Sequence, residues 1–177
     1  MATKILIAGF GGQGILFAGK ALAYTGLKCG KEVSWLPSYG PEMRGGTANC
    51  SVTISDDPIG SPIVDKPDVL IAMNLPSLEK YYNETEPKGY IIYDSSLISK
   101  QGTRDDVITV GIPATKLASD NGLDGLANMI ILGKTVKETG ILTLEQIESS
   151  LSQMVPAKKA ELLKNNIRAI ELGYNYR

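Results

Sequence analysis

The sequence predicts a three-layer α/β fold, in which a mostly parallel sheet with an antiparallel hairpin lies between helices and further helices follow at the C-terminus. Short apolar runs with β-branched residues recur along the chain and are typical of strands in such a sheet. They occupy residues 4–10, 32–37, 68–73, 89–94 and 106–112. Segments with helical character separate most of them, which is the element order of a parallel α/β sheet.

The first predicted unit runs from a strand over residues 4–10 through a glycine-rich turn into a helix that begins at Ile15. Gly30 is expected to end this helix. Gly19 and Gly26 fall near one helical face, so the helix should lie close to the sheet. The strand over residues 32–37 completes a βαβ unit, and such crossovers are right-handed in nearly all cases.

Residues 47–54 (TANCSVTI) alternate strictly between polar and apolar side chains. A period of two predicts a strand with one buried apolar face and one exposed polar face. The following segment, 55–62 (SDDPIGSP), is rich in turn-forming residues. Residues 61–64 (SPIV) are therefore predicted to pair back as the second strand of the antiparallel hairpin.

The remaining helices are predicted from periodicity and from their start and stop signals. They cover residues 75–86, 113–121, 125–139, 143–155 and 157–172. Thr143 and Gln146 are spaced as a capping box, and Gly140 and Gly173 are expected to end the helices before them. The sequence contains no repeat, low-complexity tract or linker, so residues 1–177 are predicted to form a single domain.

Composition excludes several classes of function. A net charge of -1 gives no basic excess for neutralising phosphates, so nucleic-acid binding is disfavoured. No apolar run approaches the roughly 20 residues of a membrane helix. The N-terminal residues MATKILIAGF lack a signal-peptide cleavage pattern and enter a strand at once, which predicts a cytoplasmic protein with no membrane association.

The chain lacks the usual equipment of a self-contained catalyst. It has no histidine, which removes a histidine general base, a Ser-His triad and histidine metal ligands. Its two cysteines, Cys29 and Cys50, match neither zinc nor iron–sulfur spacing and are expected to be small buried residues. We therefore predict no catalytic residue and no metal ligand in this chain.

A glycine motif between the first predicted strand and helix is the first candidate site. Gly9-x-Gly11-x-x-Gly14 stands where a Rossmann-like fold holds a pyrophosphate on a helix N-terminus. Gln13 either caps the helix or bonds a ligand or partner. The candidate ligand-binding residues of this turn are Gly9, Gly11, Gly12, Gln13 and Gly14. A bare βα turn without ligand is the alternative.

An NAD-type site also needs an acidic residue at the end of the second strand, to bind the ribose hydroxyls. That strand ends in Trp35-Leu36-Pro37-Ser38, and Glu32 lies at its beginning instead. A standard NAD site is therefore disfavoured. Asn74 follows the strand 68–73 at the sheet edge where ligand crevices form, and it is a further candidate for ligand binding. Capping of the next helix explains Asn74 at least as well.

The segment SYGPEMRGGT is the second candidate site. Its Arg44 can clamp a carboxylate or phosphate, and the glycines after it allow close approach. The bland alternative is an exposed turn with a Glu42–Arg44 pair worth at most about 1 kcal/mol. Tyr39 and Met43 favour an interface, where both residue types are enriched. The predicted ligand or partner loop comprises Ser38, Tyr39, Gly40, Pro41, Glu42, Met43, Arg44, Gly45 and Gly46.

Together, GFGGQGI and SYGPEMRGGTANCSVTIS resemble the gamma subunit of 2-oxoacid:ferredoxin oxidoreductases, the family of the pyruvate, 2-oxoisovalerate and 2-oxoglutarate enzymes. The resemblance covers nearly the whole chain. It implies a multi-subunit enzyme in which 2-oxo acid, coenzyme A and oxidised ferredoxin give acyl-CoA, carbon dioxide and reduced ferredoxin. It also implies that other subunits hold thiamine diphosphate, Mg²⁺ and the iron–sulfur clusters, that the gamma subunit lies on the coenzyme A side, and that the isolated chain binds no cofactor and is inactive.

This resemblance gives the site residues two expected roles. Residues 9–14 would form a backbone anion nest for a coenzyme A phosphate or a partner segment, and residues 38–46 would dock onto the thiamine-binding subunits. The alternatives are a free-standing NAD(P)- or flavin-binding oxidoreductase and a non-catalytic interaction module. The sequence leaves the 2-oxo acid open, with 2-oxoglutarate or a branched-chain acid favoured. The polar face of residues 47–53 offers a surface for a homodimer of the isolated chain.

Overall fold

The computed structural model describes residues 1–38, 47–99 and 102–177, and within them it contains a six-stranded sheet in the order β2-β3-β1-β4-β5-β6. β3 is antiparallel to both of its neighbours, β1 and β2, whereas β1, β4, β5 and β6 form a parallel ladder. The strands are β1 (Ala2–Phe10), β2 (Glu32–Ser38), β3 (Thr47–Ser55), β4 (Val69–Ala72), β5 (Tyr90–Asp94) and β6 (Ile108–Ile112). The predicted mostly parallel α/β sheet is confirmed.

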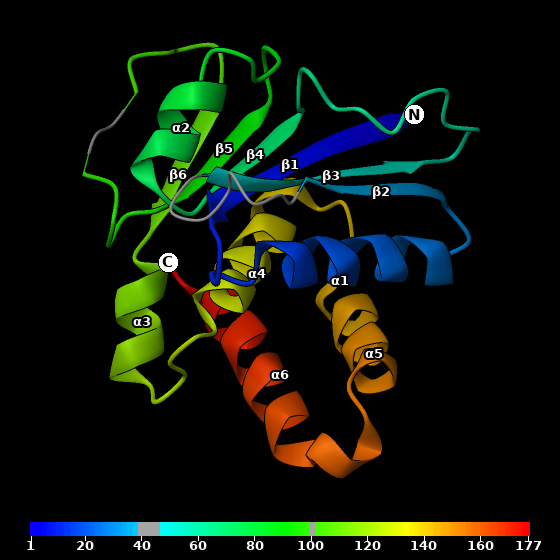
Figure 1. Cartoon of the computed structure of the whole chain (residues 1–177), viewed down its shortest axis with the longest axis vertical. Helices are drawn as coiled ribbons and strands as arrows, with labels where there is room; N and C mark the ends of the chain where they lie inside the picture. The colour runs from blue at the N-terminus through cyan, green and yellow to red at the C-terminus, as the bar shows by residue number, and fades with distance from the viewer. Residues whose placement is uncertain (39–46, 100–101) are drawn as a thin grey trace.

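Helices cover the two faces of the sheet unequally. Figure 1 shows α2 above the sheet and the other α-helices below it. The helices are α1 (Ile15–Lys28), α2 (Leu75–Tyr81), α3 (Ala114–Asp120), α4 (Ala127–Thr139), α5 (Leu144–Met154) and α6 (Ala160–Asn175), with a short 3-10 turn, η2 (Ala157–Lys159), before α6. The three predicted layers are present, and one of them consists of a single short helix. In the described residues, no helix has the length and apolar character of a membrane span.

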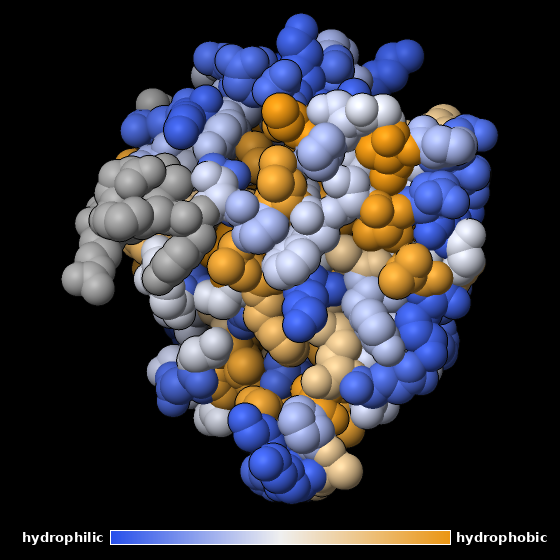
Figure 2. All heavy atoms as spheres, turned by 45° about the vertical axis from the view of Figure 1, so that its right-hand side comes forward, coloured by the Kyte–Doolittle hydropathy of each residue, from blue (hydrophilic) through white to orange (hydrophobic). Residues whose placement is uncertain are grey.

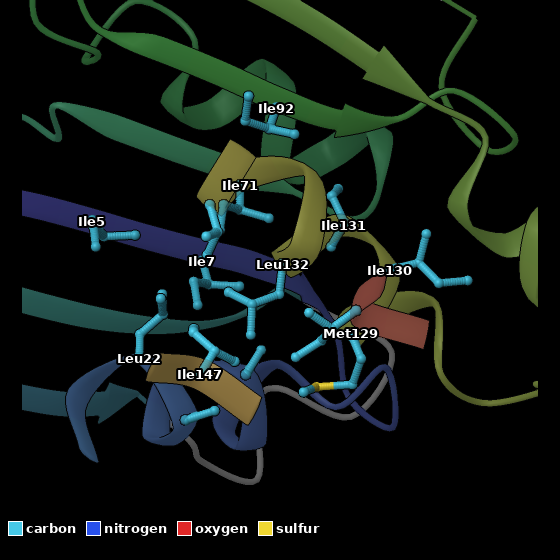
Figure 3. Close-up of a cluster of buried hydrophobic side chains, with 14 of the residues drawn as sticks. Ile5, Ile7, Leu22, Ile71, Ile92, Met129, Ile130, Ile131, Leu132 and Ile147 are labelled. Carbon is cyan, nitrogen blue, oxygen red and sulfur yellow. The ribbon is translucent and has the colours of Figure 1, made fainter. Parts of the chain in front are cut away.

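The larger hydrophobic core lies between the sheet and the helices below it. Alternate side chains of β1, Ile5 and Ile7, point into this core together with Ile71 and Ile92 of the neighbouring strands (Figure 3). α4 supplies the facing side chains, among them Leu132, which is fully buried. A smaller core on the other face contains Leu6, Val64, Leu70 and Leu78. β1 is thus buried on both faces, as its continuous apolar run predicts.

The antiparallel hairpin exists, but its second strand is not the predicted one. β3 pairs with β2, which precedes it in the chain, and on its other edge with β1. Because both edges of β3 are taken, residues 61–64 have no edge to pair with, and they form no strand. Val64 instead packs into the smaller core. β1 and β2 run parallel as the βαβ unit predicted, but β3 lies between them.

The polar face of β3 is buried, which contradicts the predicted exposure. Ser51, Thr53 and Ser55 are only 7%, 3% and 3% exposed. The segment after β3, with Pro58 and Ile59, lies over this face, and a cavity of about 260 Å³ is left between them. The alternation of polar and apolar residues correctly predicted which side chains share a face of β3. It could not predict that a loop covers the polar face and excludes bulk water from it. The predicted contact of this face with a second copy of the chain is therefore wrong, because the face is covered.

Small residues allow α1 to lie against β2 and β3, as predicted. A Cβ on Gly19 would overlap the Cys50 sulfur and lie 3.3 Å from the Trp35 indole nitrogen. A Cβ on Gly26 would lie 3.1 Å from Val33 and 3.3 Å from Ile54. The helix axis therefore sits closer to this part of the sheet than a larger residue would permit.

Gly173 does not end the last helix. It lies inside α6, which continues to Asn175, and a Cβ there would overlap the backbone carbonyl oxygen of Ile130 in α4. Gly133 of α4 is in a matching position against the carbonyl oxygen of Ile170. The glycines are thus used for backbone contact between two helices. Gly140, by contrast, does end α4 with φ 64, as predicted.

The remaining start signals behave as predicted. The Thr143 side chain accepts a hydrogen bond from Gln146 N, and the Gln146 side chain accepts one from Thr143 N, which is a complete capping box. Asn74 caps α2, and its Oδ1 accepts a hydrogen bond from Ser77 N at 2.8 Å. The predicted helix over 75–86 ends earlier, at Tyr81.

The two cysteines differ in environment. Cys50 is 0% exposed in the core, whereas Cys29 is only partly buried. The expected burial is therefore confirmed for Cys50 and not for Cys29. Burial raises the pKa of the Cys50 thiol to about 11, although the Trp35 indole N–H, which donates to its sulfur, acts in the opposite direction.

We expect iodoacetamide at pH 8 to modify Cys29 and spare Cys50 in the native chain, because thiolate is the reacting form. Mass spectrometry should find both modified in urea, and equal labelling of the native chain would contradict the buried position.

Candidate functional site

The glycine turn joins β1 to α1 at the end of the sheet where β1 and β4 terminate. Gly12 and Gly14 have φ 88 and 72, a left-handed conformation that favours glycine. A Cβ on Gly9 would come within 2.8 Å of the Met73 Cβ, so the end of β1 has no room for a side chain. The motif therefore has structural reasons for its glycines at positions 9, 12 and 14.

Gln13 is an internal brace of the turn. Its Oε1 accepts a hydrogen bond from Phe10 N at 2.6 Å, and its Nε2 donates to the Met73 carbonyl oxygen at 3.2 Å. The side chain does not cap α1, whose N-cap residue is Gly14. Of the roles left open by the sequence, the structure thus excludes capping. Gln13 fixes the turn to the end of β4.

Asn128 is a second brace, and the sequence analysis missed it. It lies in the first turn of α4, is 4% exposed, and donates from Nδ2 to the Gly14 carbonyl oxygen at 3.0 Å. Its Oδ1 is buried and has no hydrogen-bond partner among the described residues. The pairing spans 114 residues of sequence, and no local pattern signals it.

The braced turn presents free backbone donors. The N-terminus of α1 has no side-chain cap and no acidic residue in its first turn. Among the described residues, no atom lies within 4 Å of a Cβ added to Gly11 or Gly12, so the space beside these two glycines is open there. Free N–H groups at a helix N-terminus, together with the positive end of the helix dipole, favour an anion.

Hollows lie on both sides of the glycine turn. One, of about 320 Å³, is lined by Phe10, Ile15, Phe17 and Ala48 together with the glycines. The other, of about 380 Å³, lies toward α3 and α4, and Gly12 and Gln13 form part of its wall. Apolar side chains next to backbone donors suit a ligand or partner that carries both an apolar part and an anionic group.

Asn74 lines neither of these two hollows. It is 2% exposed, and in the described part of the chain its Nδ2 and the nearby Ser77 hydroxyl have no hydrogen-bond partner. The capping role considered for Asn74 is confirmed, and ligand binding by its Nδ2 stays a prediction. Asp94, at the end of β5, is likewise a turn residue whose carboxylate accepts hydrogen bonds from Ser96 N and Thr115 N.

The second candidate site is only partly described. Ser38 ends β2, opposite Asn49 of β3, at the same end of the sheet as the glycine turn. The other predicted residues of this loop, Tyr39, Gly40, Pro41, Glu42, Met43, Arg44, Gly45 and Gly46, lie outside the described residues.

The described surface at this end of the sheet includes large apolar side chains. Phe10, Trp35 and Leu36 are 39%, 40% and 38% exposed. The sequence analysis had noted none of these exposures. Figure 2, in which the right-hand side of Figure 1 is turned forward, shows apolar side chains across the middle of a different face and hydrophilic side chains along its top and lower right. Trp35 and Leu36 follow each other in β2 and therefore point to opposite faces of the sheet, so the three side chains do not form one continuous apolar patch.

The geometry disfavours a standard NAD site. In such a fold the acidic residue stands at the end of the strand beside β1. Here Glu32 pairs with Ser55, which pairs with Ala2, so it lies at the opposite end of the sheet from the glycine turn. β3 also separates β1 from β2. Among residues 1–38, 47–99 and 102–177, no group of three or more His, Cys, Asp or Glu side chains could hold a metal ion.

The antiparallel strand inserted next to β1 and the braced glycine turn at the sheet edge make this an α/β protein that differs from the standard dinucleotide-binding fold. A family model described as pyruvate ferredoxin/flavodoxin oxidoreductase matches residues 4–176. The chain therefore belongs to this family.

Three known proteins show how the chain relates to the family. It is 40% identical over 97% of its length to ketoisovalerate oxidoreductase subunit VorA of Methanothermobacter thermautotrophicus, of which it spans 35%. Its structure matches the keto/oxoacid ferredoxin oxidoreductase gamma subunit from Geobacter sulfurreducens with a TM-score of 0.83 and 29% identity, over 97% of this chain and 96% of the other.

The third is 2-oxoglutarate:ferredoxin oxidoreductase from Magnetococcus marinus with 2-oxoglutarate, coenzyme A and succinyl-CoA bound. The TM-score is 0.86 and the identity 25%, over 97% of this chain and 30% of that one. The chain thus spans about a third of two longer relatives. It spans nearly all of a gamma subunit, and this similarity was predicted from the sequence. The homologues are subunits of oxidoreductases of the oxoacid:ferredoxin type.

Proposed function

We propose that residues 1–177 form the gamma unit of a cytoplasmic, multi-subunit 2-oxoacid:ferredoxin oxidoreductase. The complex would convert a 2-oxo acid and coenzyme A to acyl-CoA and carbon dioxide, and it would pass the electrons to ferredoxin. The family match over residues 4–176 is the observation that carries this proposal. Because relatives act on ketoisovalerate and 2-oxoglutarate, a branched-chain 2-oxo acid or 2-oxoglutarate is the expected substrate.

Thiamine diphosphate, Mg²⁺ and the iron–sulfur clusters would be held by other subunits. The chain has no histidine and two cysteines, and its described acidic and cysteine side chains do not group as metal ligands. The residues present therefore do not fit these groups. The isolated chain is expected to be inactive.

The first part of the mechanism concerns the glycine turn. We propose that the N–H groups of Gly11 and Gly12 and of the first turn of α1 bind an anion, which is a phosphate of coenzyme A or a carboxylate of a partner segment. The open space in front of both glycines and the uncapped helix support this role. Gln13 and Asn128 would hold the turn in the binding conformation, because each fixes one side of it.

Replacing Gly11 by alanine tests the anion nest. The new Cβ would meet no atom of residues 1–38, 47–99 and 102–177 within 4 Å, so the thermal stability of the isolated chain should stay unchanged. Inside the complex the methyl group would stand where the anion approaches. We expect either a raised KM for coenzyme A with an unchanged KM for the 2-oxo acid, or weaker assembly.

These two outcomes distinguish a phosphate from a partner carboxylate. Gly60→Ala is the matched control, since its Cβ would also meet nothing within 4 Å and it lies far along the chain from the turn. Wild-type assembly and wild-type coenzyme A dependence in Gly11→Ala would remove the anion nest from the proposal while leaving the family assignment intact.

The second part concerns the loop of residues 38–46. We propose that it docks onto the thiamine-binding subunits, with Arg44 binding an acidic or phosphate group there. The exposed Phe10, which ends β1 at the same end of the sheet, would extend this contact surface. Aromatic residues and arginine carry much of the energy of such interfaces.

Replacing Arg44 by alanine should leave the isolated chain folded, with an unchanged circular dichroism spectrum. The activity of the reconstituted complex should fall at least about tenfold, because loss of one partner of a buried charged pair costs roughly 2–5 kcal/mol. Arg177→Ala, at the exposed C-terminal residue, is the matched control. An Arg44→Ala complex that assembles and turns over like the wild type would rule out this role.

A further inference from the structure

A further hollow lies under the loop that joins β3 to β4, at the end of the sheet opposite the glycine turn. Figure 1 shows this loop above the sheet, beside the N-terminus. The space beneath it is the cavity of about 260 Å³ over the polar face of β3. Its wall is formed by the start of β1, the end of β3, residues 58–61 and Ile63. We refer to it as the β3–β4 cavity.

The register of the sheet brings polar side chains together in this cavity. Lys4 of β1 is paired directly with Thr53 of β3, and Ala2 is paired with Ser55. Directly opposed residues of neighbouring strands have their side chains on the same face of the sheet. It is the face of Leu6, which belongs to the smaller core. Lys4, Thr53 and Ser55 therefore share one surface under the loop, and all three line the cavity.

Thr53 has a hydroxyl that the fold itself does not use. The residue is 3% exposed and lines the cavity. Its hydroxyl has no hydrogen-bond partner among residues 1–38, 47–99 and 102–177. Most polar side-chain atoms of residues buried to this degree have a partner. The Thr53 hydroxyl is therefore available to a molecule that enters the cavity.

The two serines of the cavity are available mainly as donors. Ser55 Oγ accepts a hydrogen bond from Asp57 N at 3.0 Å, and Ser61 Oγ accepts one from Ile63 N at 3.2 Å. A hydroxyl that accepts in this way still has its hydrogen to donate. Within the described chain, no acceptor takes either hydrogen. The ammonium group of Lys4, likewise, can only donate.

The acidic side chains near the cavity are engaged elsewhere. Asp56 and Asp57 both bind the amino group of Met1, at 3.4 Å. Asp68 accepts a hydrogen bond from the backbone N of Lys4 at 2.8 Å. None of these three carboxylates lines the cavity. The Lys4 ammonium forms no ion pair with a described residue, so the wall of the cavity contains one positive charge that the chain does not neutralise.

We propose that the β3–β4 cavity binds a small organic oxyanion, with its anionic group on Lys4 and Thr53 and a short apolar part against Ile63. An ammonium and three hydroxyls, with no acidic group in the wall, favour an anion. Ile63 is 59% exposed, and the apolar part would cover it. The volume of about 260 Å³ is below the roughly 300–1,000 Å³ of pockets for drug-sized ligands, so the ligand must be small. Glu32, which is paired with Ser55 from β2, lies outside the wall.

This proposal does not rest on the proposed function. The cavity lies where β1 begins, whereas the glycine turn follows the last residue of the same strand, Phe10. An anion bound in the cavity and an anion bound by the turn would therefore change the environment of different residues, and either site can fail without the other.

Amide chemical shifts of the ¹⁵N-labelled 177-residue chain test the site. Butyrate has a carboxylate and a short apolar chain, and at constant ionic strength it should shift the amides of Thr53, Ser55 and residues 59–61 until they saturate. Butylamine has the same chain with a positive group and should not shift them. Inorganic phosphate identifies the anionic group. A lower dissociation constant than that of butyrate would assign a phosphate to the site, and a higher one would assign a carboxylate. Shifts at Gly11 and Gly12 would report the glycine turn separately.

Thr53→Val distinguishes ligand binding from a structural role. The hydroxyl has no partner in the described chain to lose, so the free energy of unfolding should not fall. The dissociation constant of butyrate should rise at least about threefold. Lys4→Met should raise it at least about tenfold, because hydrogen bonds to charged groups are stronger than neutral ones. Lys164→Met is the matched control and should have no effect, since Lys164 is an exposed lysine of α6, below the sheet.

Three results would overturn the proposal. The first is that neither butyrate nor phosphate shifts the amides around the cavity. The second is that Lys4→Met binds like the wild type, or that Lys164→Met loses as much affinity as Lys4→Met. The third is that Thr53→Val destabilises the chain and leaves the dissociation constant unchanged, because the hydroxyl would then have a structural role only.

Discussion

Replacing Gly173 by alanine is expected to lower the midpoint of thermal unfolding by about 2–12 °C. The added Cβ would overlap the Ile130 carbonyl oxygen of α4, and it would also lie 2.7 Å from the carbonyl carbon. These are backbone atoms, which cannot rotate away as a side chain can, so the two helices must separate. Overpacking of this kind costs typically about 1–3 kcal/mol and occasionally more, and 1 kcal/mol corresponds to about 2–4 °C for a chain of this size.

The sign of this effect is opposite to that of helix propensity. Alanine is about 1 kcal/mol better than glycine in a helix interior, so a glycine that only weakened α6 would give a more stable variant. Gly60→Ala is the control for the substitution itself, because a Cβ at Gly60 would meet no atom within 4 Å. Urea and thermal unfolding followed by circular dichroism measure both variants. A Gly173→Ala chain as stable as the wild type would show that α4 and α6 do not touch through this residue.

Gly173 also shows where sequence reasoning about helices reaches its limit. Gly140 and Gly173 both follow an amphipathic segment, and local sequence assigns the same role to both. Gly140 does end its helix, whereas Gly173 lies against Ile130 in the middle of a helix–helix contact. The difference depends on α4, which is distant in the sequence, and a local pattern contains no information about it.

Most strands of the sheet were predicted correctly, but their order and their pairing partners were predicted less well. Apolar runs located β1, β4 and β5, because burial on both faces removes polar residues from a strand. The run over residues 106–112 also located β6, although most residues of this edge strand are exposed. The place of β3 between β1 and β2 was not predicted, and the predicted exposure of its Ser51 and Thr53 was wrong. Pairing partners and covering loops are tertiary facts, and alternation within one strand cannot report them.

The candidate site divides in the same way. The turn between β1 and α1 was predicted from its glycines. These glycines are informative because positive φ angles and close packing restrict the residue type at their positions. Gln13 was recognised as the polar residue of the turn, but its bond to the Met73 carbonyl oxygen could not be foreseen. Asn128 was missed altogether, since nothing near it in the sequence connects it to Gly14.

Replacing Gly14 by alanine should destabilise the chain by about 2–4 kcal/mol through two separate effects. Gly14 has φ 72, and alanine in the left-handed region costs about 1 kcal/mol. The new Cβ would also overlap the Asn128 side-chain nitrogen and lie 2.8 Å from its Cγ. Asn128 must then give up its hydrogen bond to the Gly14 carbonyl oxygen, and a buried polar group without its partner costs about 1–3 kcal/mol.

A double-mutant cycle with Asn128→Ala separates the two effects. Without the Asn128 amide, the Cβ at position 14 has space and the hydrogen bond is already absent, so only the cost of the left-handed alanine, about 1 kcal/mol, should be left. Gly11→Ala is the control in the same turn, because its Cβ would meet no atom within 4 Å. Equal destabilisation by Gly14→Ala in both backgrounds would mean that Asn128 does not brace the turn. The anion-binding conformation would then have to be maintained by Gln13 and the glycine dihedrals alone.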